Sequence, residues 1–298
     1  MENLRGSILM VLSMAGFALE DMFIKRLAGN LAVGQIIMLL GLGGALVFGA
    51  LTTAQGRRLW SRDLLSRPVL LRNGGEIVGT FGFVLAIALT PLSSASAILQ
   101  ATPLVVTLGA ALFLGEAVGW RRWSAILVGF CGVLLVIRPG FAGFEPASLF
   151  AVLSVIGLAI RDLATRAVPR TISSMQLSTY AFAMLVPTGA LLLAFHGTPA
   201  LPSAVNTRDL VLALLCGVLA YYAIVAAMRL GDVAVITPFR YTRLIFALII
   251  GVTLFDERPD VWTLGGAAII IFSGIYTFWR ERRLGRRAQP PAAAIAPR

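Results

Sequence analysis

Apolar runs of about 20 residues follow one another along the chain, separated by short polar connections that contain glycine or proline. A helix of that length crosses the hydrocarbon core of a bilayer and satisfies its own backbone hydrogen bonds there. The first run is followed by further spans and lacks a signal-peptide cleavage pattern. The pattern predicts ten membrane-spanning helices, at about residues 4–26, 31–53, 69–90, 93–115, 120–138, 147–167, 174–195, 209–229, 232–255 and 260–279.

The first and sixth predicted spans share one arrangement of apolar and polar positions. Residues 11–27 read VLSMAGFALEDMFIKRL and residues 152–168 read VLSVIGLAIRDLATRAV, a shift of 152 − 11 = 141 positions. The same shift pairs Gly16 with Gly157, Asp21 with Asp162, Lys25 with Arg166, Gln35 with Gln176 and Glu116 with Glu257.

Five spans in each copy is an odd number, so the second copy enters the membrane from the opposite side. The expected fold is therefore an all-α polytopic membrane protein, with ten transmembrane helices as two five-helix inverted-topology repeats around a central cavity. The copies are expected at residues 4–143 and 144–279, followed by a basic, disordered tail at residues 280–298.

Composition and charge agree with a membrane protein. Charged residues make up 13% of the chain and hydrophobic residues 58%, whereas a soluble domain carries about a quarter charged residues. The net charge is +11, from 25 basic and 14 acidic residues. Its arginines are concentrated in the segments on the N-terminal side of the membrane, which predicts cytoplasmic termini. Because they are spread over many short loops, they do not indicate a nucleic-acid surface.

The chain resembles the drug/metabolite transporter superfamily of the EamA-repeat type, and within it the bacterial YddG-like amino-acid exporters. The resemblance is strongest in PLSSASAILQATPLVVTLGAALFLGEAVGWRRWSAILVGFCGVLLV at residues 91–136 and in FDERPDVWTLGGAAIIIFSGIY at residues 255–276. The second copy departs from the family pattern, with Thr242 near the position that corresponds to Pro103 and with Asp256-Glu257 in place of Gly-Glu. The resemblance implies a transporter of the bacterial inner membrane.

Polar residues within the spans are the candidates for function, because an ionisable group at membrane depth costs roughly 2.5–3.5 kcal/mol and usually faces a cavity or a partner. Asn73, Glu76, Thr80 and Phe83 recur at steps of three and four and share a helix face. On the fourth span Ser93, Ser96, Gln100, Pro103 and Thr107 do the same. Pro103 can kink that helix, and the serines are equally compatible with close helix packing.

The ninth span contributes Arg240 and Arg243, a pair suited to a carboxylate or phosphate. The alternative is that they pair internally with Asp162, Glu76 or Asp21. Tyr221 and Tyr241 offer aromatic walls with a polar tip. The expected substrate-binding set is Glu76, Thr80, Phe83, Ser96, Gln100, Tyr221, Arg240, Tyr241 and Arg243.

Acids in the first and sixth spans are candidates for coupling. Glu20, Asp21 and Asp162, with Pro103 as a hinge, could couple or gate transport. The alternative is that Asp21 pairs with Lys25 and Asp162 with Arg166 at i+4. Glu116 and Glu257 are each predicted to cap the helix that follows.

These features favour a secondary transporter that exports small polar metabolites, with amino acids preferred and other metabolites or cationic drugs as alternatives. An intramembrane enzyme is disfavoured because no HExxH motif or nucleophile–base pair occurs, and a sensor because no soluble domain is present. No P-loop, cofactor motif or metal-ligand spacing is found. The expected partners are a small-molecule substrate and the lipid bilayer. A monomer can suffice for function, and the oligomeric state is left open.

Overall fold

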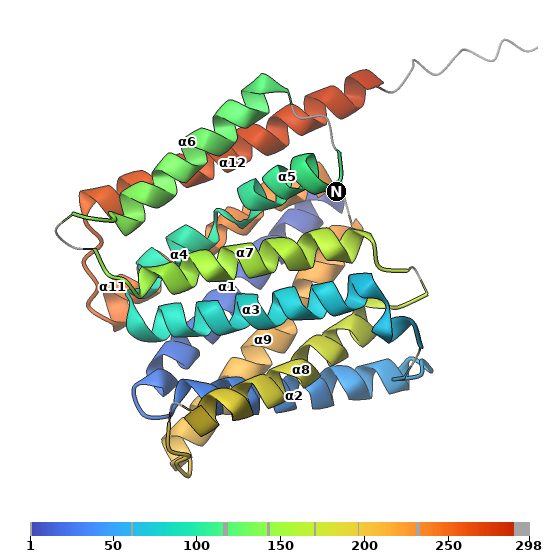
Figure 1. The fold of residues 1–298 in the computed structure, drawn as a ribbon, viewed down its shortest axis with the longest axis vertical. Helices are drawn as coiled ribbons and strands as arrows, with labels where there is room; N and C mark the ends of the chain where they lie inside the picture. The colour runs from blue at the N-terminus through green and yellow to red at the C-terminus, as the bar shows by residue number, and fades with distance from the viewer. Residues whose placement is uncertain are drawn as a thin grey trace, which may run out of the picture.

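The computed structural model of the protein describes residues 2–60, 62–115, 119–141, 144–169, 171–195, 197–230 and 233–288. All regular secondary structure in these residues is helical (Figure 1). The elements in chain order are α1 (Glu2–Ala28), α2 (Val33–Ala54), η1 (Arg62–Leu65), α3 (Arg67–Leu89), α4 (Leu92–Leu99), α5 (Thr102–Phe113), α6 (Trp120–Ile137), α7 (Ser148–Arg166), α8 (Ser174–Phe195), α9 (Ala204–Leu230), α10 (Val233–Ile236), η2 (Thr237–Tyr241), α11 (Thr242–Leu254) and α12 (Val261–Ala288).

All ten predicted spans correspond to helices of the structure. By length and composition, eight helical stretches of the described residues can cross a membrane, and α6 and α12 add two shorter apolar helices. The fourth span consists of α4 and α5 together, and the ninth of η2 and α11, preceded by α10. The sequence prediction of an all-helical protein with ten transmembrane helices is confirmed.

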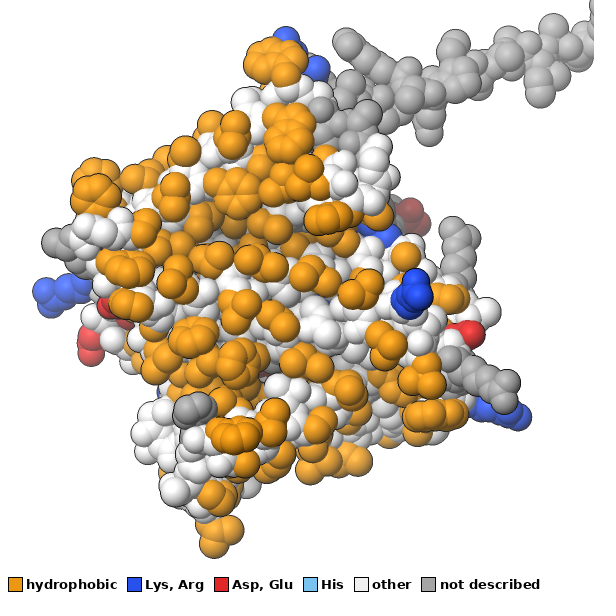
Figure 2. Space-filling model, in the orientation of Figure 1, with side chains coloured by type: hydrophobic (Ala, Val, Ile, Leu, Met, Phe, Trp, Pro, Cys, Tyr) orange, Lys and Arg blue, Asp and Glu red, His pale blue; other side chains and the backbone are white. Residues whose placement is uncertain are grey.

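Apolar side chains cover the outer surface between the two ends of the helices. Figure 2 shows hydrophobic side chains across one face, with charged side chains mostly at the two margins. Phe113 and Val261 are each 82% exposed. Such large exposed hydrophobic groups are unfavourable in water and suit contact with lipid tails.

The helices pack in pairs that are related by exchange of the two repeats. α1 packs along α9, and α3 packs along α7, and exchanging the copies converts the first pair into the second. α2 with α8 and α6 with α12 are each pairs of equivalent helices, seen side by side in Figure 1. Gly157, the residue of α7 that the repeat pairs with Gly16, lets the backbones of α3 and α7 come into contact. A Cβ added at Gly157 would overlap the backbone of Gly79.

The matched glutamines also make equivalent contacts. Near the start of α2, Gln35 donates from Nε2 to the carbonyl of Ala200 at 2.6 Å and accepts from the Ala200 N–H at 3.1 Å. Near the start of α8, Gln176 donates from Nε2 to the carbonyl of Arg58 at 2.7 Å. Each glutamine therefore ties the start of its helix to a connection in the other repeat, which explains why both copies carry it.

The fourth span is interrupted near its middle and the ninth in its first half, whereas the hydropathy pattern alone predicts continuous helices. α4 ends at Leu99, and α5 begins at Thr102 with Pro103 in its first turn. In the ninth span a 3₁₀ turn with Pro238 in its first turn separates α10 from α11. Proline lacks a backbone donor and begins a new helix readily. Interrupted helices at equivalent places of two repeats are typical of substrate sites in secondary transporters.

The bundle has two ends, named here for a charged residue near each. At the Lys25 end α1, α3, α6, α8 and α11 finish and α2, α4, α7, α9 and α12 begin; the Arg72 end is opposite.

The C-terminal region differs from the sequence expectation. α12 continues to Ala288, so residues 280–288, expected to be disordered, are helical. Apart from Gly285, this stretch consists of arginine, glutamate, leucine and alanine, which are all good helix formers. Residues 289–298 lie outside the described residues, as does Glu116.

Candidate functional site

Arg243 makes a bidentate ion pair with Asp21 of the first span. From the start of α11 it donates through Nε to Asp21 Oδ2 at 3.1 Å, and through Nη2 to both carboxylate oxygens at 2.8 Å. Its guanidinium also lies over the rings of Phe17 and Phe83, 5.2 Å from each centroid. Asp21 is only 2% exposed. Of the two alternatives for Arg243, internal pairing is the one observed.

The predicted i,i+4 pair between Asp21 and Lys25 is wrong. Lys25 Nζ donates to the carbonyls of Ile87 at 3.1 Å and Thr90 at 2.6 Å, and lies 3.6 Å from Glu257 Oε1. Asp21 and Lys25 are four residues apart on α1, but the packing directs one toward α11 and the other toward the end of α3. Tertiary partners therefore replace the weak local pair, which would contribute only about 0.2–0.5 kcal/mol.

A second polar cluster lies between α3 and α7. Arg161 donates from Nε to Asp162 Oδ1 at 2.8 Å and from Nη1 to Glu76 Oε1 at 3.3 Å. Arg72 lies 3.8 Å from Glu76 and also donates to the carbonyl of Leu177 at 3.2 Å. Asp162 thus forms its ion pair with the adjacent Arg161. Sequence reasoning left Arg161 out of the expected site, although an arginine within a span was itself a sufficient signal.

Arg240 lies where the two interrupted spans meet. Gln100, at the end of α4, donates from Nε2 to the carbonyl of Arg240 at 3.2 Å, which joins the break in the fourth span to the break in the ninth. The Arg240 guanidinium lies within electrostatic range of Asp162, Arg161 and Arg243. Among the described residues it makes no hydrogen bond or ion pair. It is therefore a cation available to a ligand, unlike Arg243.

Glu20 is an acid of the first span that, like the cation Arg240, has no ion-pair partner among the described residues. Its carboxylate lies against α9, where an added Cβ at Gly217 would be 2.5 Å from Glu20 Oε1. It makes no hydrogen bond or ion pair with another described residue, whereas the adjacent Asp21 is held by Arg243. An acid in this position can gain and lose a proton without breaking an ion pair.

The two tyrosines of the expected site have different environments. Tyr221 is half-buried, its hydroxyl 2.5 Å from Ser178 Oγ, and its ring meets Phe48 edge-on at 5.0 Å. Tyr241 is buried, and its hydroxyl has no hydrogen-bond partner among the residues that the structure describes. That hydroxyl lies close to Gly274 of α12, so Tyr241 packs between helices.

The remaining expected residues lie along α3, α4 and α5. Thr80 is partly buried on the same helix as Glu76. Ser96 is 1% exposed, and its hydroxyl has no hydrogen-bond partner in the described part of the chain. The carbonyl of Pro103, in the first turn of α5, accepts a hydrogen bond from Thr107 Oγ1 at 2.9 Å.

Glu257 does not cap the helix that follows it. Its carboxylate accepts from the backbone N–H groups of Leu92 at 2.5 Å and Ser93 at 3.0 Å, and from Ser93 Oγ at 2.7 Å. It therefore caps α4, in the other repeat, where the helix dipole favours an anion. The N-terminus of α12 is capped by Asp260, which accepts from the Thr263 N–H at 2.9 Å.

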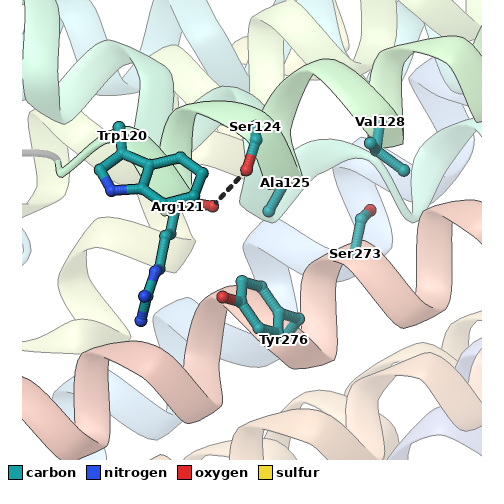
Figure 3. A pocket seen from close by; sticks show the side chains of 7 residues that line it. All are labelled: Trp120, Arg121, Ser124, Ala125, Val128, Ser273 and Tyr276. Atoms are coloured by element: carbon teal, nitrogen blue, oxygen red, sulfur yellow. Dashed lines mark hydrogen bonds between the residues drawn. The ribbon is translucent and has the colours of Figure 1, made fainter.

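A shallow groove between α6 and α12 lies apart from these polar clusters. Figure 3 shows its lining, with Trp120 and Arg121 at one mouth and Tyr276 across from them on α12; the other lining residues are Ser124, Ala125, Val128 and Ser273. Within the described part of the chain no group of three or more His, Cys, Asp or Glu residues could hold a metal ion.

The sequence profile of the EamA-like transporter family matches residues 4–138 and 146–279. The chain belongs to the EamA-like transporter family. It is a secondary transporter of the drug/metabolite transporter superfamily, and not an enzyme. The resemblance to this family inferred from the sequence is thus confirmed.

Relatives with named substrates carry several kinds of molecule. The family member is 28% identical to an S-adenosylmethionine uptake transporter of Rickettsia bellii (73% of this chain, 75% of the relative). It is 29% identical to a riboflavin transporter of Rhizobium johnstonii (75% and 72%). A pseudopaline exporter of Pseudomonas aeruginosa is 24% identical over 91% of this chain and 94% of the relative. These names do not support the narrower likeness to YddG-like amino-acid exporters.

A solved crystal structure shares the fold of this family member. It superposes with a TM-score of 0.61 at 19% sequence identity, over 93% of this chain and 99% of the other. At that identity the likeness supports the architecture alone. The family match, taken with this architecture, makes the protein a multi-pass membrane transporter with bacterial relatives.

Proposed function

We propose that the protein exports a small polar metabolite that carries a carboxylate, with amino acids the favoured class, by alternating access between its two repeats. The observation that carries this proposal is Arg240, a cation within the ninth span that has no bound anion among the described residues. A charge in that position is costly unless it meets water or a partner. A substrate carboxylate can be that partner, through a bidentate charge-assisted hydrogen bond.

The surrounding charges suit a substrate with both signs. Arg72, Arg161 and Arg240 contribute three positive charges and Glu76 and Asp162 two negative ones, leaving 3 − 2 = +1 for a single anionic group. The Glu76 and Asp162 side chains are 17% and 30% exposed, so each keeps free acceptor capacity while it holds Arg161. An ammonium group beside the carboxylate could use that capacity, which favours an amino acid over a simple acid.

The named relatives support this chemistry in part. S-adenosylmethionine ends in an amino-acid group, and the relatives that carry it include the one from Rickettsia bellii. Riboflavin has no carboxylate, so riboflavin-like metabolites and cationic drugs are the competing substrates. The relatives include both uptake transporters and an exporter, and export from the cytoplasm is our proposal.

Transport by purified protein in liposomes tests the proposal. A panel of labelled amino acids, S-adenosylmethionine, riboflavin and a quaternary ammonium drug would be offered with and without a proton gradient, in both directions. We expect saturable movement of at least one amino acid or of S-adenosylmethionine. Movement of riboflavin or the drug alone would contradict the carboxylate assignment.

Proton coupling is expected to depend on Glu20. Replacing Glu20 with Gln should preserve substrate exchange and abolish accumulation driven by a proton gradient, because the amide cannot carry a proton. Asp21 and Asp162, the other two acids expected to couple or gate transport, are both held by arginines, so their amides should instead disturb packing. If the Glu20→Gln protein still accumulates substrate against a gradient, Glu20 is not the carrier.

The repeats and the orientation are further parts of the proposal. We place the repeats at residues 4–143 and 144–279, in a bacterial inner membrane, with the Lys25 end facing the periplasm and both termini in the cytoplasm. A cysteine replacing Thr198 should then react with a membrane-impermeant maleimide in intact cells, and one replacing Gly56 should not. Native Cys131 and Cys216 would first be changed to Ser. The reverse labelling pattern would invert the orientation.

A further inference from the structure

One carboxylate ties together four segments at the Lys25 end. Glu257, in the connection after α11, receives the two N–H groups and the hydroxyl at the start of α4. Lys25 joins this carboxylate to the end of α3 through the carbonyls of Ile87 and Thr90. The four segments are α1, α3 and α4 of the first repeat and the α11–α12 connection of the second.

The contact is enclosed. The side chains of Lys25 and Glu257 are 16% and 7% exposed. Leu92 and Ser93 are at most 1% exposed, and the Lys25 ammonium lies 5.4 Å from the ring centre of Phe255. The network is therefore a largely buried ion-pair contact between the two repeats at this end of the bundle.

We propose that Lys25 and Glu257 form a latch that holds the Lys25 end of the transport path closed. This inference rests on the proposed alternating access, in which each end must open in turn. Lys25 and Glu257 act as positioning residues: they do not contact substrate, but set the fraction of molecules that are open at this end.

The position of the latch suits a contact that opens and closes. It joins α4 to the end of α11, and these are the segments at the Lys25 end of the two interrupted spans. A break in a helix gives such a segment a point about which it can turn. Once open, the carboxylate, the ammonium and the N–H groups are all hydrated, so hydration offsets part of the free energy lost when the ion pair separates. An apolar contact of similar area would instead expose hydrophobic surface to water when it opens, and nothing would offset that free energy.

A glycine offers a way to disturb the latch without changing charge. Gly251 of α11 lies against Glu257, and an added Cβ would overlap the Glu257 carboxylate. The backbone N–H of Glu257 also donates to the Gly251 carbonyl at 2.9 Å. Gly251→Ala should therefore displace the carboxylate from α4. Gly265→Ala in α12 is the matched control, because a Cβ there meets nothing within 4 Å.

Accessibility of a cysteine behind the latch tests the proposal. Ser96 lies one turn along α4 from Ser93 and is 1% exposed, so Ser96→Cys, with Cys131 and Cys216 changed to Ser, is the reporter. A membrane-impermeant maleimide would be added from the side that the Lys25 end faces, in the background and with Glu257→Gln, Lys25→Gln, Gly251→Ala or Gly265→Ala.

We expect the first three variants to label about tenfold faster or more, as for loss of a charge-assisted hydrogen bond from the closed state. Gly265→Ala should label at the background rate. Ser13→Cys, buried between α1 and α9, reports unfolding and should stay unreactive throughout. Unchanged labelling of Ser96→Cys, or faster labelling only together with Ser13→Cys, would overturn the latch and leave Glu257 a static helix cap.

The labelling requires no substrate, so it separates this inference from the proposed function. Labelling that rises as expected, while the liposome panel shows no transport, would keep the latch and reject the substrate class. Transport of amino acids with unchanged labelling would do the opposite.

Discussion

Replacing Asp21 with Asn, or Arg243 with Gln, should lower the free energy of unfolding by about 3–5 kcal/mol, since each change leaves one charge of a buried pair without its partner. The geometry and burial of the Asp21–Arg243 ion pair favour a large loss of stability. Three hydrogen bonds of 2.8–3.1 Å join the groups, and the Asp21 side chain is 3% exposed. Thermal melting of the purified variants in one detergent measures the loss.

The double variant Asp21→Asn with Arg243→Gln distinguishes the loss of the ion pair from the cost of leaving one charge buried without its partner. It removes both charges, so it should melt above either single variant, and the loss should be far smaller than the sum of the two. Arg240→Gln is the matched control, three residues away on the same span. Single variants that melt like wild type would show that water, and not the partner, solvates these charges.

Replacing Arg240 with Gln should weaken transport while the protein melts near wild type. A charge-assisted hydrogen bond to substrate contributes roughly 1.5–3 kcal/mol, so the apparent affinity should fall by about tenfold to a hundredfold. Stability should hold because Arg240 makes no hydrogen bond or ion pair through its side chain among the described residues. The measurement is the concentration dependence of uptake into liposomes, with melting recorded on the same preparations.

Two further variants make the Arg240 result specific. Arg240→Lys keeps the charge but loses the planar fork, and should rescue poorly if the carboxylate is bound through two nitrogens. Arg57→Gln removes an exposed arginine of a connection and should leave both transport and melting unchanged. Early melting of Arg240→Gln would make Arg240 structural and direct attention to Glu76 and Gln100.

The span pattern and the repeat were accessible from the sequence because each depends on local or periodic information. Hydropathy over about 20 residues decides whether a segment can cross a bilayer. A shift of 141 positions matched Gly16 with Gly157 and Gln35 with Gln176, and the structure shows why such residues recur. They sit at close helix contacts and at ties between repeats.

The interruption of the ninth span was harder to foresee. The hydropathy of residues 232–255 predicts one continuous helix, and Pro103 has no proline at the matched position of the second copy. The break is placed instead by Pro238, six residues before the position that Pro103 predicts when shifted by 141. Hydropathy measures burial in lipid and is insensitive to a 3₁₀ turn within an apolar run.

The partners of the charges were decided only by the tertiary structure. The sequence identified Asp21, Arg240, Arg243 and Glu257 as charges that require an explanation, and local spacing suggested Lys25 for Asp21. Asp21 and Arg243 are 222 positions apart, and Glu257 caps a helix 165 positions earlier in the chain. Ion pairing depends on which faces of packed helices meet at a few ångströms, and periodicity along one helix does not determine the rotation of another against it. The sequence alone therefore determined the class, the spans and the repeat, while the packing decided which arginine is held and which is left for a ligand.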